Sequence, residues 1–160
     1  MLVGEQPGDQ EDIAGEPFVG PAGQLLRASL EEAGLDPAEV FLTNAVKHFK
    51  WKPQGKRRIH EKPNREQVLA CRLWLDEEIE SVKPALIVAL GATAASTLLG
   101  SAAKVTRDRG KYFPSTLAPL VSVTVHPSSI LRAPDSAARA QARKEFVRDL
   151  KNFARKLKRI

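Results

Sequence analysis

The run Ala85–Leu90 constrains the fold more than any other segment of this sequence. Its residues, ALIVAL, are all apolar, and the run stops at Gly91. A strand that is apolar at every position is buried on both faces, and such strands belong to parallel sheets that helices cover on both sides. Three other apolar runs have the composition of strands, namely Met1–Val3, Val40–Val46 and Leu120–Val125.

Helical patterns separate these runs. The predicted helices are Ala22–Ala33, Arg65–Val82, Ala92–Leu99 and Ser136–Lys158. Strands and helices alternate, and 160 residues allow one domain of ordinary size. The sequence therefore predicts a single domain over residues 1–160 with an α/β fold, in which three layers (α/β/α) surround a central four-stranded parallel sheet.

The first of these strands is short and stands at the start of the chain. Met1–Val3 has three residues, whereas strands usually have five or six. We therefore expect residues of the same domain to precede Met1 in a complete form of the protein.

Composition excludes several classes of protein. With 42% hydrophobic and 28% charged residues, the chain has the balance of a folded globular protein and not of a disordered one. No stretch approaches the roughly 18 uncharged apolar residues of a membrane helix, and no signal-peptide pattern is present. Cys71 is the only cysteine, so no internal disulfide can form. We expect a monomer in the cytoplasm.

Charge is distributed unevenly along the chain. Residues 1–46 carry one basic and nine acidic side chains, whereas residues 47–65 carry eight basic and one acidic. Residues 133–160 carry nine basic and three acidic. The basic block and the basic tail indicate a partner with a phosphate backbone. A solvated loop and a solvated helix face explain the same charges equally well.

Unusual residues follow the predicted strands, where the binding sites of parallel α/β sheets collect. Residues 4–12 read GEQPGDQED, an acidic turn that is neither a dinucleotide fingerprint nor a phosphate-binding loop. Its four carboxylates would repel a phosphate, so they suit a cationic centre or the positioning of water. A solvated acidic turn is the alternative.

Several other residues have both a functional and a structural interpretation. Phe18 is either a stacking surface for a base or a cap on the core. Asn44 either pairs with the edge of a base or caps a turn. His126 either donates to a developing anion or forms an ordinary hydrogen bond. Beyond it, the apolar pair Ile130–Leu131 could wedge into a base stack.

Three possible nucleophiles or ligands lie in and after the basic block. His60 ends the segment KRRIH and could act as a nucleophile or base near phosphates, although such loops usually only contact phosphates. His48 and Cys71 are metal-ligating residue types, but two ligands do not make a site. Cys71 also lies on an apolar helix stripe, where a buried inert thiol is the usual finding.

The motifs GEQPGDQED, PFVGPAG, TNAVKHF, KRRIH and HPSSILR, in this order, closely resemble those of the iron–sulfur uracil-DNA glycosylases, and within them the UdgX type. The match runs from residue 2 to about residue 133. Gln6 is the UdgX form of a position that is Ala in the general branch. The segment Lys56–His60 is the insertion that distinguishes the type.

The resemblance implies a uracil-DNA glycosylase fold and a role in DNA repair. Phe18 would stack on the flipped uracil, Asn44 would read its pairing edge, and His126 would hydrogen-bond its carbonyl oxygen and stabilise the leaving anion. Glu5, with Gln6 and Asp9 beside it, would lie near the sugar. By this resemblance the catalytic residues are Glu5, Gln6, His60 and His126, and the uracil-binding residues are Asp9, Phe18, Asn44 and His126. DNA would be held by Lys56, Arg57, Arg58, Ser128, Ser129 and Arg132.

The resemblance also implies a 4Fe-4S cluster. Cys71 matches one ligand position, and His48 stands where the general branch has another Cys. The Cys pair that the family carries upstream of its first strand is missing, so this chain offers two of the four ligand positions. We expect it to bind the cluster poorly or not at all.

Two classes of function follow. The leading hypothesis is a DNA glycosylase that excises uracil from DNA, preferably single-stranded, and is then captured on the sugar C1′ through His60 in a single turnover. A conventional hydrolytic iron–sulfur uracil-DNA glycosylase is the alternative. The other class is a truncated, non-catalytic DNA-binding module.

Overall fold

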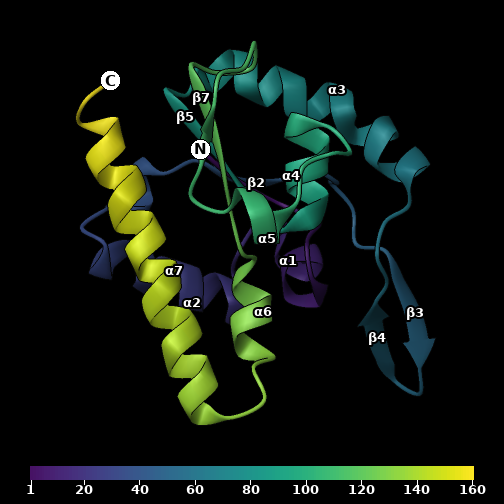
Figure 1. Cartoon of the computed structure of the whole chain (residues 1–160). Helices are drawn as coiled ribbons and strands as arrows, with labels where there is room; N and C mark the ends of the chain where they lie inside the picture. Colours follow the sequence, from purple (N-terminus) through teal and green to yellow (C-terminus); the bar gives the residue numbers. More distant parts are fainter.

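A five-stranded sheet with the strand order β2-β1-β5-β7-β6 forms the centre of the computed structural model, which describes residues 1–160 (Figure 1). Its strands are β1 (Leu2–Gly4), β2 (Leu42–Asn44), β5 (Leu86–Leu90), β6 (Tyr112–Phe113) and β7 (Leu120–Thr124). The four predicted strands are present and pair in parallel, and β6 joins the edge antiparallel to β7. The predicted α/β fold is confirmed, with one further edge strand.

Helices cover both faces of this sheet. They are α1 (Asp9–Ala14), α2 (Pro21–Glu32), α3 (Arg65–Val82), α4 (Ala92–Leu99), α5 (Val105–Asp108), α6 (Pro127–Leu131) and α7 (Ser136–Leu157), with a 3-10 turn η1 (Pro37–Glu39). The predicted helices correspond to α2, α3, α4 and α7, whereas α1, α5 and α6 have four to six residues and lack a periodic apolar pattern. None of the helices is both long and apolar enough to span a membrane.

The central strand β5 divides the core into two halves. Ile87 and Ala89 pack with residues of α3 and α4 on one face of the sheet. Leu86, Val88 and Leu90 pack with residues of α2, α6 and α7 on the other face. Successive side chains of a strand point to opposite faces, so a run that is apolar throughout serves both layers. This arrangement explains why Ala85–Leu90 shows no alternation.

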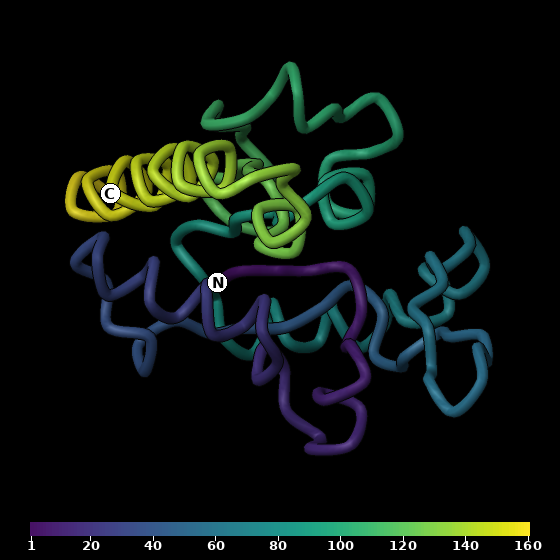
Figure 2. Tube along the Cα trace, turned by 90° about the horizontal axis from the view of Figure 1, so that it is seen from below, coloured from purple at the N-terminus to yellow at the C-terminus, as the bar shows by residue number.

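A second sheet lies in the segment 47–65, which the sequence had indicated as a basic loop. Strands β3 (Trp51–Gln54) and β4 (Arg57–His60) pair antiparallel and form a hairpin. The hairpin projects from the body on the side opposite to α7 (Figure 2). All four residues of β3 are exposed, so no alternation of buried and exposed residues marks it as a strand.

Candidate active site

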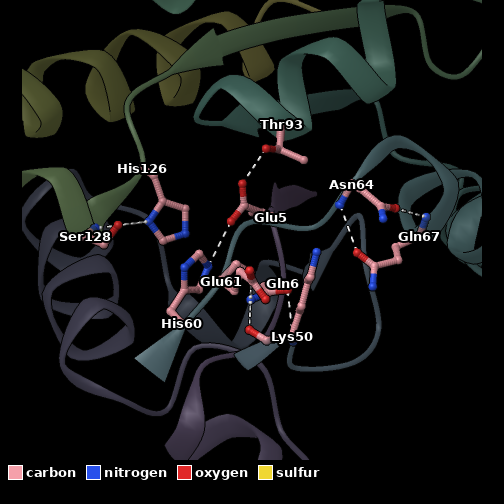
Figure 3. A network of polar contacts seen from close by, with 10 residues as sticks. All are labelled: Glu5, Gln6, Lys50, His60, Glu61, Asn64, Gln67, Thr93, His126 and Ser128. Atoms are coloured by element: carbon pink, nitrogen blue, oxygen red, sulfur yellow. Dashed lines mark hydrogen bonds and ion pairs between the residues drawn. The ribbon is translucent and has the colours of Figure 1, made fainter. Parts of the chain in front are cut away.

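Four segments that follow parallel strands meet at one edge of the sheet. Glu5 follows β1, Asn44 ends β2, Thr93 lies in the first turn of α4 after β5, and His126 follows β7. Gly4 pairs directly with Asn44 in the β1–β2 register. Figure 3 shows Glu5 reaching Thr93 on one side and His60 on the other, with the ring of His126 drawn beside them. The fold thus brings together residues that are up to 121 positions apart, as between Glu5 and His126.

Gly4 lies at the point where three of the predicted site residues converge. A Cβ atom at this position would collide with Asn44 Oδ1, lie 2.7 Å from Phe18 Cζ and lie 3.5 Å from His126 Nε2. A contact under 3.0 Å is one that real Cβ atoms essentially never show. Glycine is therefore required here because the amide, the phenyl ring and the imidazole approach the backbone so closely.

Phe18 is held at this point by a strained loop. Its φ is 55°, in the left-handed region that residues with a Cβ rarely adopt. Gly23 of α2 lies so close that a Cβ there would collide with the Phe18 backbone. Glu11 fixes the other end of the loop, since its Oε1 accepts a hydrogen bond from Gly20 N at 2.8 Å. Strain of this kind persists where surrounding contacts over-determine the backbone, often at functional sites.

Asn44 is buried, at 6% exposure, and its side-chain amide makes no hydrogen bond within the protein. Its backbone oxygen accepts a hydrogen bond from Lys47 Nζ at 2.8 Å. The same ammonium also donates to Glu78 Oε2 at 2.7 Å and to Thr43 Oγ1 at 2.8 Å. An amide that is fixed through its backbone but free at its side chain can donate to and accept from a ligand at once.

His126 is a neutral hydrogen-bond donor. Burial lowers the pKa of its imidazole to about 4, which outweighs the opposing effect of Glu5. Its Nδ1 accepts a hydrogen bond from Ser128 N at 3.1 Å. A neutral imidazole carries one proton, and an Nδ1 that accepts leaves that proton on Nε2. Nε2 is the nitrogen that faces Gly4, so the donor points toward Phe18 and Asn44.

Glu5 connects the sheet to the hairpin. Its Oε2 accepts a hydrogen bond from Thr93 Oγ1, and its Oε1 lies 3.0 Å from His60 Nε2. Thr93 is nearly buried, at 8% exposure, and belongs to the first turn of α4. Glu5 is therefore an oriented anion next to a partly exposed imidazole.

The base of the hairpin is held by Gln6. Its Nε2 donates to the backbone oxygens of Lys50 and Glu61, at 3.1 and 3.2 Å, and its Oε1 accepts from Lys50 N at 3.2 Å. Gln6 is 7% exposed. Its amide is thus occupied by the backbone at both ends of the hairpin, and the place near the sugar that the resemblance implies for Gln6 stays a prediction.

Arg58 fastens the face of the hairpin that carries His60. Its NH2 lies 2.5 Å from Asp9 Oδ1 and its NH1 lies 2.7 Å from Asp12 Oδ2. The structure pairs Arg58 with Asp9, and the contacts with DNA and uracil that the resemblance implies for these two residues stay predictions. We therefore interpret them as residues that position His60, which lies two residues after Arg58 on β4.

The profile of the Uracil DNA glycosylase superfamily matches residues 1–151. The chain belongs to the uracil DNA glycosylase superfamily.

Several relatives of the chain are named type-4 uracil-DNA glycosylase. The chain is 41% identical to the one from Pyrobaculum aerophilum, over 96% of this chain and 75% of the relative. For Thermotoga maritima the identity is 40%, over 82% and 66%, and for Saccharolobus solfataricus it is 37%, over 84% and 62%. The chain thus spans 62 to 75% of the length of these relatives. The expected resemblance is confirmed for the superfamily, whereas the UdgX assignment stays a prediction.

The remaining expected DNA contacts of this uracil DNA glycosylase superfamily member lie on the surface around the site. Lys56 and Arg57 are exposed at the hairpin turn, and Ser129 and Arg132 are exposed on and after α6. Ser128 is half-buried, and its Oγ lies 2.8 Å from His126 Nδ1. Ile130 is 1% exposed and packs in the core with α2 and α7. It does not form the exposed wedge that the sequence had indicated.

Four residues of the site escaped the sequence analysis. Glu5 is oriented by Thr93, and the loop of Phe18 is held by Glu11. Asn44 is held by Lys47, which is itself paired with Glu78. Thr93 lies 88 positions from Glu5 and Glu78 lies 31 positions from Lys47, and none of the four stands in a pattern that signals its contact. The only available signal for Thr93 was its position directly after a buried strand, where sites collect.

His48 and Cys71 lie together, but they do not complete a cluster site. Cys71 Sγ lies 3.6 Å from His48 Nδ1 and accepts a hydrogen bond from Lys47 N at 3.4 Å. No group of three or more His, Cys, Asp or Glu side chains is arranged to hold a metal ion. A 4Fe-4S cluster takes four protein ligands. The residues of this chain therefore do not fit it.

We predict that iron and acid-labile sulfide in the purified 160-residue chain are far below one cluster per molecule, because only two donors are in reach. Colorimetric iron and sulfide assays measure this directly. A stoichiometric cluster with its visible absorbance would contradict the prediction.

Titration of His126 should make stability depend on pH. Its pKa is about 4 in the folded protein and about 6.5 when unfolded. As the pH falls through this window the unfolded chain binds the proton first, so the free energy of unfolding drops by roughly 2–4 kcal/mol. In His126→Asn, Asn can still cap α6 but does not titrate. Urea unfolding at several pH values should show a shallower decline in the variant, and equal slopes would contradict the assignment.

The contacts of Arg58 should restrain the hairpin. In the double variant Asp9→Asn, Asp12→Asn, trypsin should cut after Lys56 or Arg57 roughly two to ten times faster, because exposed ion pairs restrain a structure only modestly. The variant keeps every trypsin site, and Glu16→Gln serves as a control for loss of an acidic side chain nearby. Unchanged cleavage would mean that the contacts of Gln6 and the Glu5–His60 contact hold the hairpin without Arg58.

Proposed function

We propose that this protein excises uracil from DNA. The observation that carries the proposal is the convergence of Phe18, Asn44 and His126 on Gly4, with the Glu5 carboxylate on the next residue. A stacking ring, a free amide and a neutral donor are the groups that a pocket for one extruded base requires. Membership of the superfamily and the names of the relatives support the same activity.

In the proposed reaction the uracil leaves as an anion and the sugar becomes cationic at C1′. The C1′–N1 bond breaks, and its electron pair departs with the base. The Nε2–H of His126 donates to the carbonyl oxygen on which negative charge develops. The ionised carboxylate of Glu5 stabilises the oxocarbenium-like sugar. Since His126 is already neutral at neutral pH, its donor is ready without a change of protonation.

We further propose that His60 captures the sugar. The 3.0 Å contact between His60 Nε2 and Glu5 Oε1 puts an imidazole beside the carboxylate that faces C1′. As the base departs, Nε2 gives its proton to Glu5 and forms a bond to C1′, so that charge and protons balance. The product is a protein–DNA adduct in place of free abasic DNA.

A hydrolytic glycosylase is the second candidate, and the comparisons favour it. The names of the relatives state a glycosylase activity and mention no adduct. In this reaction water attacks C1′ and Glu5 accepts its proton, while His60 would only orient the carboxylate. A non-catalytic DNA-binding module remains as a third outcome, because the basic segments support DNA binding without any chemistry.

Denaturing gel electrophoresis with a uracil-containing single-stranded oligonucleotide separates these candidates. Covalent capture predicts a band that survives heat and detergent and is absent in His60→Ser. The matched control is His48→Ser, which removes another exposed histidine outside the Glu5 site and should keep the band. Free abasic product from the unaltered protein would overturn capture and support hydrolysis. Intact uracil in every lane would overturn both enzymatic proposals.

A further inference from the structure

Trp51 is an exposed aromatic side chain on the same face of the hairpin as His60. The two residues are direct cross-strand partners of β3 and β4. Such partners project to one face of the ladder, with Cβ atoms about 4.5–5.5 Å apart. Trp51 is 42% exposed, although burial of an indole ring is strongly favourable. The ring has no role in the candidate active site.

The ring is held in place by the contacts that also position His60. The Arg58 guanidinium lies 5.6 Å from the centroid of the Trp51 ring and 5.4 Å from that of Phe49. Arg58 is itself paired with Asp9 and Asp12. The indole is thus supported on one side by a fixed cation, and 42% of the residue is exposed to solvent beside the site.

The hairpin that carries Trp51 is basic. Lys52 and Arg57 project from its opposite face and Lys56 lies at its turn. All three are exposed, and none of them forms an ion pair with an acidic side chain. An aromatic surface combined with free cations is the combination that binds single-stranded nucleic acid, because bases stack on the ring and phosphates contact the cations. A purely apolar protein partner would leave these cations without a counter-charge.

We propose that Trp51 is a stacking platform for the nucleobase next to the extruded nucleotide in single-stranded DNA. The inference rests on the proposed function, which puts the sugar of the extruded nucleotide between Glu5 and His60. Cross-strand partners such as His60 and Trp51 have Cβ atoms about 4.5–5.5 Å apart, a separation that one nucleotide step along an unstacked strand can span. One nucleotide can therefore occupy the site while its neighbour covers the indole.

Trp74 provides a matched control. It is the only other tryptophan and is 57% exposed. It lies on α3 beside Glu77 and Glu78, outside the Glu5 site, and acidic neighbours disfavour DNA. In Trp74→Phe the intrinsic tryptophan fluorescence reports on Trp51 alone.

The test measures binding to single-stranded oligonucleotides with a central tetrahydrofuran residue, which has no base to excise. One oligonucleotide keeps both neighbouring bases, and two others replace the 5′ or the 3′ neighbour by a second tetrahydrofuran. Trp51→Ala should raise Kd for the first oligonucleotide about 5- to 100-fold, the range that loss of one stacked base gives. Trp51→Phe should stay within about threefold, since it keeps a ring, and Trp74→Ala should bind like the unaltered protein.

The decisive comparison removes the base from the DNA instead of the ring from the protein. For the unaltered chain, loss of one neighbouring base should weaken binding, whereas for Trp51→Ala the same loss should cost nothing further. In Trp74→Phe, the first oligonucleotide should quench the fluorescence of Trp51. If Trp51→Ala weakens all three oligonucleotides equally, or if the fluorescence does not change on saturation, the proposal is wrong.

Failure of the proposed function gives a different result. An unaltered protein that leaves uracil in place but shows the base-dependent loss at Trp51 would refute excision and keep the stacking platform. An unaltered protein that excises uracil while Trp51→Ala binds every oligonucleotide normally would refute the platform alone.

Discussion

Parallel pairing of β1 between β2 and β5 is the constraint on which the rest of the site depends. This pairing sets Gly4 against Asn44 and aligns the carboxyl ends of the central strands. The register therefore decides which side chains meet, because a shift of one residue would turn every side chain of a strand to the other face. Although β1 and β2 have only three residues each, burial on both faces keeps their register unique. The chemistry of the site is thus a consequence of strand alignment.

Much of the fold was readable from the chain because burial leaves a pattern. The all-apolar strand β5 and the striped helices α3 and α7 were predicted within one or two residues of their observed bounds, since each packs against a large part of the core. The hairpin and β6 were not predicted. Their stability comes from backbone pairing and from contacts such as those of Gln6, which leave no periodic signal.

The candidate site divides in the same way. Glu5, Phe18, Asn44, His60 and His126 could be selected from motif order, and the structure brings these five together. The partners of other side chains could not be assigned from the sequence. A side chain that has several possible partners pairs with the one that the folded chain brings next to it. The Arg58 cation suits a phosphate equally well, but in the structure it forms ion pairs with two carboxylates of the acidic turn. No sequence rule ranks such competing partners, whose distances depend on the whole fold.

The two-stranded hairpin has its own ladder of hydrogen bonds and shares no strand with the central sheet. It is joined to the body through a few polar groups, chiefly Gln6, Arg58 and the Glu5–His60 contact. Because the hairpin is attached in this way, its length and its sequence can change during evolution without repacking of the core. Under the proposed function, base recognition and the fate of the sugar are then heritable traits that can diverge independently within a single scaffold.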